Sequence, residues 1–393
     1  MLLNPTDDQA LLQQTTATFL DELVPPDVLR GLRDDPAGQP HGYWERGAEL
    51  GWTSLLVSED HGGGAVGDHG LVDLTLIATE FGRHAAPGPL GPTNVVAALV
   101  SQRGGDDHAD AVHALVAGTS IAAWCLTEPT PNHRWGRWAL DVRVDGGEVV
   151  LNGTKRPVDS ANLADLLLVT GCTDDGLTNV LVPSSTPGVT VRPMQSLELT
   201  RRYAAVEFVD VRLPLTAVIG EVGAGAADVE WAARHGMVIA AAESVGAMQA
   251  TFDMTVEWGF DRYSFGRPLA SYQALKHRFA DMKSWLEASH AIADAAALAV
   301  ATDEPDATET TLAASAYIGQ YGPELAHDCV QIHGGIGVTF EHDLHFFLRR
   351  IVANRSAYGT PDEHRRRLAD ILAGQATPPA VPAAHQHAVL EPR

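Results

Sequence analysis

The spacing of apolar residues predicts helices over the first part of the chain. Thr6 stands before two acidic residues and is expected to be the N-cap of a first helix, which Pro25 and Pro26 end. Another helix is expected from about Leu71 to about Phe81. Between the two, residues 50–64 are expected to form a helix end, a short extended piece and a glycine-rich loop.

The pattern changes near Ile121, where short runs rich in β-branched residues replace the helical spacing. Turn-forming clusters such as Asp145-Gly146-Gly147 separate these runs. This alternation predicts a small antiparallel β domain. Its strands are expected at residues 142–144, 149–151, 166–169, 179–182, 189–191 and 206–208.

Helical spacing returns after a linker that contains Pro214 and Gly220–Gly225, and it continues to about residue 373. Four long helices fit this region and would pack as an antiparallel bundle. They are expected to end near Arg262, to run from Ser271 to about residue 302, to run from Ala307 to about Ile332, and to run from Glu341 through Leu368. No βαβ alternation is visible, so a Rossmann dinucleotide site is not supported.

These patterns predict an α+β fold that is mainly α. The expected domains are an N-terminal helical domain over residues 1–120, a middle β domain over 121–222 and a C-terminal helical bundle over 223–375. Residues 376–393 are rich in Pro and Ala, lack periodicity and are expected to be disordered.

The composition narrows the class of partner. The formal net charge of −23, from 50 acidic and 27 basic residues, disfavours nucleic acid and membrane surfaces but still allows a local basic pocket. No apolar run approaches the ~20 residues of a membrane span, and the N-terminus shows no secretion signal. The three cysteines are few and far apart, which fits a reducing cytoplasm and indicates neither disulfides nor a metal site.

The stretch from Asp261 to Met282 carries the most informative chemistry. It interrupts a long helical pattern at Gly266-Arg267-Pro268 and places Arg262, Phe265 and Gln273 around the interruption. A cation, an aromatic edge and an amide at one corner can contact a ligand that bears a diphosphate.

This stretch resembles a motif of the flavin-dependent acyl-CoA dehydrogenase family. Further motifs resemble the family in its order and at its spacing, and they are Leu50-Gly51-Trp52 with Gly62-Gly63-Gly64, Leu126-Thr127-Glu128-Pro129, Leu151-Asn152-Gly153-Thr154-Lys155, and Gln331-Ile332-His333-Gly334-Gly335-Ile336-Gly337. On these matches the chain is identified as a member of the family. The resemblance implies the family's fold, with a helical domain, a β domain and a four-helix bundle.

The resemblance also implies an FAD bound between the subunits of a tetramer. Strand-end residues would contact the flavin ring, and the guanidinium of Arg262 would pair with the diphosphate. The bare backbone at Gly334-Gly335 would allow a close approach. The implied cofactor contacts are Leu126, Thr127, Val158, Ser160, Arg262, Phe265, Gln273, Gln331, Gly334, Gly335 and Thr360.

The reaction that the resemblance implies is α,β-dehydrogenation of an acyl-CoA thioester. A carboxylate removes the α-proton, the β-hydrogen leaves as hydride to the flavin, and hydrogen bonds to the thioester oxygen stabilise the developing enolate. Electrons then pass to an electron-transfer flavoprotein.

Three positions depart from the family's pattern. Counting from Gly335 brings the usual catalytic Glu to Tyr358, whose reference pKa of about 10 makes it a poor base. The other known position for the carboxylate, on the first bundle helix, falls on Gly236. After Pro129, residues 131–135 replace a typical Ala-Gly-Ser-Asp, and Trp135 and Trp138 could close that loop instead.

Glu243 is the strongest remaining candidate for a catalytic base. It lies in a run of small apolar residues, where desolvation would raise the pKa of its carboxyl, and two turns from Gly236 on about the same helix face. The competing interpretation is a structural Glu satisfied by a neighbouring helix. His333 and Asp362 are weaker candidates, since His333 can simply pack and Asp362 resembles the N-cap of the last helix. Arg365–Arg367 are expected to form a solvated face.

The missing bases leave several functions open. Some relatives in bacterial steroid side-chain degradation are α2β2 heterotetramers in which one subunit type carries the carboxylate, and residues 358–364 resemble that branch. The chain can therefore be a homotetrameric dehydrogenase with an unusual base or one subunit of a heteromeric dehydrogenase. Further alternatives are a non-catalytic partner that completes another chain's FAD site and a flavin monooxygenase on the same fold. The acyl group cannot be read from the sequence.

Overall fold

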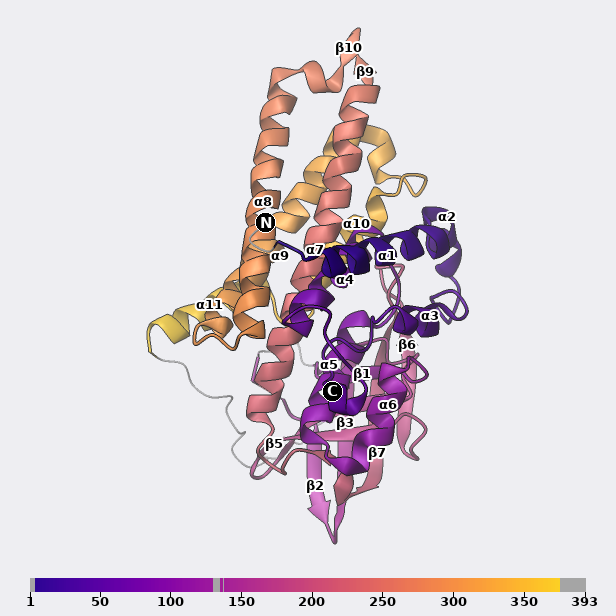
Figure 1. The fold of residues 1–393 in the computed structure, drawn as a ribbon, viewed down its shortest axis with the longest axis vertical. Helices are drawn as coiled ribbons and strands as arrows, with labels where there is room; N and C mark the ends of the chain where they lie inside the picture. The colour runs from indigo at the N-terminus through magenta and orange to yellow at the C-terminus, as the bar shows by residue number, and fades with distance from the viewer. Residues whose placement is uncertain (1–3, 130–134, 137, 375–393) are drawn as a thin grey trace, which may run out of the picture.

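The computed structural model describes residues 4–129, 135–136 and 138–374. The expected disordered tail and most of the altered loop at residues 131–135 lie outside these residues. The sheet lies at one end of the long axis, and two long helices extend to the other end. The first N-terminal helices pack beside the middle of these long helices, and the later ones lie by the sheet (Figure 1).

The N-terminal region is helical and begins as the sequence predicts. Thr6 caps the first helix, its hydroxyl accepting a hydrogen bond from the Gln9 backbone N–H while the Gln9 side chain accepts from the Thr6 N–H. The helices are α1 (Asp7–Leu23), α2 (Pro26–Leu32), α3 (Tyr43–Glu49), η1 (Glu59–His61), α4 (Gly70–Arg83), α5 (Leu90–Arg103), η2 (Asp106–His108) and α6 (Ala109–Val116).

One local prediction in this region is wrong. The extended piece expected within residues 50–64 is a series of turns followed by η1. Trp52 explains the compact shape, since it is fully buried, its ring lies 4.8 Å from that of Phe81, and its Nε1 donates to Thr16 Oγ1. A buried aromatic anchor of this kind holds the turns against the helices.

The middle region is an eight-stranded sheet in the order β6-β7-β3-β2-β4-β5-β8, with β1 also paired to β4. Most strand pairs are antiparallel, as expected, but β4 runs parallel to both β1 and β2. The β2–β3 hairpin lies between β1 and β4 in the chain, which gives the chain room to return in the same direction. The elements are β1 (Ala122–Cys125), β2 (Asp141–Asp145), β3 (Glu148–Asp159), β4 (Leu166–Thr173), β5 (Gly176–Pro183), β6 (Val189–Met194), β7 (Tyr203–Pro214), η3 (Leu215–Ala217) and β8 (Val218–Ile219).

The C-terminal region is a helical bundle. Its first three long helices match the sequence prediction, whereas the fourth expected helix is two helices separated by residues 355–360. Pro361 begins the second of these, since a first helical turn is the position where the missing N–H of proline costs no hydrogen bond. The elements are α7 (Ala226–Asp261), β9 (Tyr263–Ser264), β10 (Arg267–Pro268), η4 (Leu269–Ser271), α8 (Gln273–Ala301), α9 (Ala307–His333), η5 (Gly334–Val338), α10 (Leu344–Asn354) and α11 (Pro361–Leu372).

Two glycines bring α4 and α7 into close contact. A Cβ at Gly82 would lie 1.9 Å from the backbone oxygen of Glu243, and one at Gly246 would lie 2.0 Å from that of Thr79. This approach fixes the middle of α7 against the N-terminal region. No helix in the described ranges is long and apolar enough to cross a membrane.

Candidate active site

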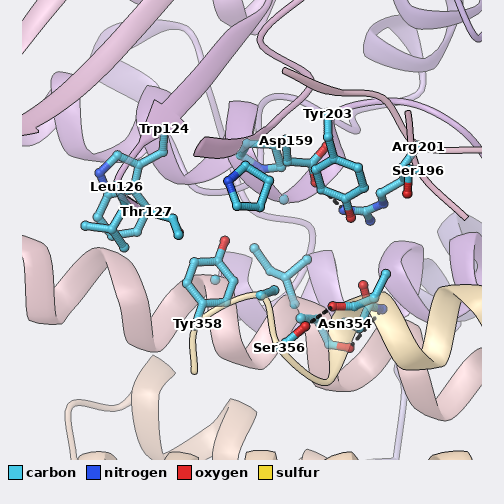
Figure 2. Close-up of a pocket in the computed structure, with 18 of the residues that line it drawn as sticks. Trp124, Leu126, Thr127, Asp159, Ser196, Arg201, Tyr203, Asn354, Ser356 and Tyr358 are labelled. Atoms are coloured by element: carbon cyan, nitrogen blue, oxygen red, sulfur yellow. Dashed lines mark hydrogen bonds and ion pairs between the residues drawn. The ribbon is translucent and has the colours of Figure 1, made fainter. Parts of the chain in front are cut away.

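A cavity of about 480 Å³ lies where the sheet meets the bundle. The end of β1, the end of β3 and the loop between β6 and β7 form its upper wall in Figure 2, and α7 and the connection after α10 form the lower wall. Its volume is in the range of a small-molecule site. Its lining is mainly apolar but includes the polar residues Asp159, Arg201, Tyr203, Glu243 and Tyr358.

Tyr358 and Gly236 meet in the lower wall. A Cβ built on Gly236 would lie 2.3 Å from Cζ and 2.4 Å from Oη of Tyr358, so the ring occupies the space that a side chain at 236 would need. The ring centroid lies 6.2 Å from that of Trp124 across the cavity. Burial raises the pKa of the Tyr358 hydroxyl above its ordinary value, and the Asp159 carboxylate raises it further, so the phenol stays protonated at neutral pH.

Glu243 is the centre of a buried ionic cluster, and its side chain is only 2% exposed. Arg201 Nη2 donates to both carboxylate oxygens at 2.7 and 2.6 Å, Arg350 Nη1 donates to Oε1 at 2.5 Å, and Asn354 Nδ2 donates to Oε2 at 2.8 Å. Burial by itself raises the pKa of the Glu243 carboxyl, but the two guanidiniums outweigh burial and hold the pKa below its ordinary value.

The expected raised pKa of Glu243 is therefore wrong. The sequence shows the small apolar neighbours on α7 but not the two cations that other elements bring. A carboxylate held by two guanidiniums and an amide is a weak proton acceptor. The contacts favour the competing interpretation, in which Glu243 is a structural residue satisfied by its neighbours.

The cluster joins three regions of the fold. Arg350, fully buried on α10, donates from Nε to Glu198 at 3.2 Å and from Nη2 to the backbone oxygen of Ala86 at 2.9 Å. Arg201 Nη1 also donates to Asp159 at 2.6 Å. The bundle, the β6–β7 loop and the N-terminal region are thus held at one point beside the cavity.

Only part of the first group of expected cofactor contacts lines the cavity. Leu126 and Thr127 do, at the end of β1, and Figure 2 shows both at its left side. Val158 and Ser160 do not, because alternate residues of β3 face opposite sides and Pro157 and Asp159 are the ones that face the cavity. Val158 is instead packed in the sheet core.

The second group lies at the tip of the bundle, in the β9–β10 hairpin and the start of α8. Arg262 and Gln273 are exposed, and Phe265 is 97% exposed with a φ of 50°. An almost fully exposed phenylalanine in the left-handed region is unusual and favours a surface that another molecule covers. Figure 1 places this hairpin at the opposite end of the molecule from the sheet, so one chain does not bring the two groups together.

The glycine pair after α9 belongs to the bundle group. Gly334 has a φ of +67°, and a Cβ at Gly334 or Gly335 would meet no atom within 4 Å. Gln331, one turn earlier, is exposed as well. This backbone is therefore open to an approaching ligand. Thr360 is exposed too, but its hydroxyl is already engaged as the N-cap of α11, where it accepts from the Glu363 N–H and donates to the Glu363 carboxylate.

The weaker candidates have local roles. His333 packs against Trp258, with ring centroids 5.1 Å apart, and burial lowers its pKa. Asp362 is not the N-cap of α11, since Thr360 is, and it pairs with Arg365 at 2.8 Å. Arg367 departs from the expected solvated face, because it pairs with Glu230 and lies over the ring of Trp135.

Profile and structure comparisons place this geometry in a known family. Residues 6–117 match the sequence profile described as acyl-CoA dehydrogenase, N-terminal domain, and residues 223–373 match that described as acyl-CoA dehydrogenase, C-terminal domain. The chain belongs to the acyl-CoA dehydrogenase family. The family membership and the fold class expected from the sequence are thereby confirmed, and the members of this family are oxidoreductases.

Individual relatives span nearly the whole chain. Acyl-CoA dehydrogenase IpdE2 of Mycobacterium tuberculosis is 29% identical over 367 residues, which cover 93% of this chain and 98% of that protein. Isobutyryl-CoA dehydrogenase of Dictyostelium discoideum is 26% identical and covers 90% of this chain and 86% of its own. The fold is similar to that of butyryl-CoA dehydrogenase from Megasphaera elsdenii, with a TM-score of 0.87, 24% identity, and 95% and 100% of the two chains covered.

Several residues in and beside the cavity were not among the residues predicted from the sequence. They are Asp159 on β3, Arg201 in the β6–β7 loop, Tyr203 on β7 and Arg350 on α10. A signal existed for Arg350, which follows Phe346 and Phe347 at helical spacing on the buried face of α10. A cation on such a face requires a buried acid, and Glu243 was already singled out as a buried acid.

Proposed function

We propose that this chain is a subunit of an FAD-dependent acyl-CoA dehydrogenase whose assembly also contains a homologous subunit that supplies the catalytic carboxylate. The substrate is an acyl-CoA thioester, and electrons leave to an electron-transfer flavoprotein. Membership of the acyl-CoA dehydrogenase family supports the reaction class. The contacts around Tyr358, Gly236 and Glu243 support the proposal that the other subunit supplies the carboxylate.

The residues present fit FAD when two protomers meet. Leu126 and Thr127 can contact the flavin ring in the cavity of one protomer, and Arg262, Phe265 and the open backbone at Gly334 of another can contact its diphosphate and adenine. A bound FAD supplies the acceptor for the hydride that leaves the β-carbon. The protein positions the thioester and holds water out of the cavity.

The proposal that another subunit supplies the carboxylate depends mainly on the side chains at three positions beside one cavity. Tyr358 is a protonated phenol, Gly236 has no side chain and no room for one, and Glu243 is held by two guanidiniums. Among the described residues that line the cavity, Asp159 is the other carboxylate, and Arg201 and Ser160 both donate to it. Neither Tyr358 nor Glu243 is thus poised to accept a proton near pH 7.

Co-expression with a family member that carries the usual Glu tests this proposal. The chain is purified alone and with that partner, and bound flavin and thioester-dependent reduction of ferrocenium are measured for each. We expect the mixed assembly to be active and the chain alone to be slower by about 10²–10⁴, the usual worth of a general base. Replacing the partner's Glu with Gln should abolish the difference.

Three results would count against the proposal. Equal turnover by the chain alone would mean that a residue of this chain acts as the base. Oxygen consumption in place of ferrocenium reduction would instead favour a flavin monooxygenase. A mixed assembly that binds FAD but stays inactive whichever residue the partner carries would favour a purely structural role.

A further inference from the structure

Lys155 and Glu128 form a buried ion pair next to the cavity residues Leu126 and Thr127. The Lys155 side chain on β3 is fully buried, and its Nζ lies 2.6 Å from Glu128 Oε1. The same ammonium donates to the backbone oxygen of Leu126 at 3.2 Å. The pair joins two sequence motifs that are 27 positions apart in the chain. A buried cation is thus bound to the backbone at the end of β1, where the chain lines the cavity.

The Glu128 carboxylate has further partners. It accepts from the backbone N–H groups of Ala139 and Leu140 at 2.8 and 2.9 Å, and its side chain is only 4% exposed. One carboxylate therefore holds residue 128 and residues 139–140 together. A buried ion pair is often no more stabilising than a well-packed apolar pair of similar volume. Stability alone therefore does not explain why two charges are buried here.

β3 binds both carbonyls of the segment that follows β1. The Leu126 oxygen accepts from Lys155 Nζ, and the Thr127 oxygen accepts from the Arg156 N–H at 2.8 Å. The pairing of β1 with β4 ends at Cys125, so these bonds to β3 hold the segment in place. Thr127 lines the cavity, and its own N–H and hydroxyl have no hydrogen-bond partner among the described residues (Figure 2). Two donors at Thr127 are thus left for a ligand.

We propose that Lys155 and Glu128 are positioning residues for the flavin ring of FAD. The Lys155 ammonium fixes the Leu126 carbonyl, and the fixed backbone holds the two free donors of Thr127 toward acceptor atoms of the ring. The inference rests on the proposed function, since it assumes that the ring of FAD lies in this cavity. It goes further by assigning the placement of the ring to an ion pair that does not line the cavity.

Three changes to this chain in the FAD-loaded assembly test the proposal. Lys155→Met removes the ammonium and leaves the Glu128 carboxylate without its cation. The double variant Lys155→Met with Glu128→Gln carries neither charge and still lacks the donor to the end of β1. Asp73→Asn is the matched control, because Asp73 is also a fully buried carboxylate that accepts from two backbone N–H groups, and it does not line the cavity.

Thermal unfolding measures stability, and visible circular dichroism and equilibrium dialysis measure the environment and affinity of the flavin. Lys155→Met should lose stability, and the double variant should regain most of it because no unpaired charge is buried. The double variant should still bind FAD about 3- to 10-fold more weakly, the worth of one hydrogen bond, and show an altered flavin band. Asp73→Asn should lose stability and keep the parent's flavin band and FAD affinity.

Thr127→Val tests whether the ion pair acts through Thr127. In the parent background this change removes the hydroxyl and should weaken FAD binding by about 3- to 10-fold. In the background of the Lys155 and Glu128 double variant the same change should weaken binding much less, because the hydroxyl is no longer held toward the ring. Residues that act on one another in this way give effects that do not add.

Other results would overturn the proposal. A double variant with the parent's FAD affinity and flavin band would show that the ion pair serves stability alone. An equal change of the flavin in Asp73→Asn would attribute the effect to lost stability, and additive effects with Thr127→Val would separate the ion pair from Thr127. If Lys155→Met does not fold, the double variant still provides the comparison. If the parent chain binds no FAD in any assembly, the proposed function itself is wrong.

Discussion

Glu243→Gln separates a structural role for this residue from a catalytic one. The substitution keeps the size of the side chain and removes its charge. In the parent protein the carboxylate accepts from Arg201, Arg350 and Asn354 and is almost completely buried. The variant therefore leaves two buried guanidiniums with less negative charge nearby.

The loss of stability expected for Glu243→Gln depends on the ion pairs that Arg201 and Arg350 keep. Breaking a buried ion pair by removing one partner typically costs ~3–5 kcal/mol. Arg201 still pairs with Asp159 and Arg350 still pairs with Glu198, so neither guanidinium is left alone. We therefore expect the lower end of the range, a loss of about 3 kcal/mol in the free energy of unfolding.

Urea unfolding measures the stability, and the rate per bound FAD in the active assembly measures the chemistry. Glu198→Gln is the matched control, because Glu198 pairs with Arg350 in the same cluster but does not line the cavity. Both variants should lose stability, and both should keep a rate per FAD within a few-fold of the parent.

A different outcome would refute this reasoning. If Glu243→Gln unfolds at the parent's urea concentration and yet loses two decades or more in rate per FAD, while Glu198→Gln does not, Glu243 is the base. The inference from its ion pairs would then have failed. A general base is worth about 10²–10⁴ in rate, so the two outcomes are well separated.

Three further predictions concern packing and pH. Gly236→Ala should lower the thermal midpoint, since its Cβ would lie 2.3 Å from Tyr358. In a double-mutant cycle, the same substitution made in a Tyr358→Ala background should lower the midpoint of that background much less. Gly82→Ala should destabilise far more, because its Cβ would meet backbone at 1.9 Å, whereas Gly31→Ala, in an open position on α2, should be neutral or slightly stabilising by urea unfolding. Burial lowers the pKa of His235 to about 4, so the folded state binds fewer protons than the unfolded state between pH 6.5 and 4, and stability falls on acidification. From pH 7 to pH 5 this residue should cost about 2 kcal/mol, a loss that His235→Gln should remove from the measured pH dependence; an unchanged slope would contradict it.

The sequence predicted the elements best where a local rule decides them. Thr6 with Gln9 makes a capping box, and the break at Gly266 separates two long helices, so both boundaries were visible in the chain. The direction of β1 and β4 was not visible, because it depends on pairing between segments some forty residues apart. The fourth bundle helix was predicted as one helix because its apolar spacing continues across residues 355–360, the segment that separates α10 from α11.

The sequence predicted those features of the site that belong to one local motif. It did not predict the ion pairs between charged residues from distant segments. The open glycines at Gly334 and Gly335 and the exposed Phe265 are local features of the motifs that contain them. The ion pairs of Glu243 join residues 42 and 107 positions away. Desolvation alone could be judged from the neighbours on α7, and it gave the wrong sign for the pKa.

The two positions without a carboxylate are coupled by packing. The ring of Tyr358 fits only because residue 236 is a glycine, and a side chain at 236 fits only if the ring is removed. A carboxylate gained at 236 would therefore be opposed sterically while Tyr358 remains. The same phenol that excludes a base places a protonated hydroxyl in the cavity, opposite Tyr203. Neither position 236 nor position 358 therefore offers a proton acceptor, in keeping with the proposal that another chain performs the deprotonation.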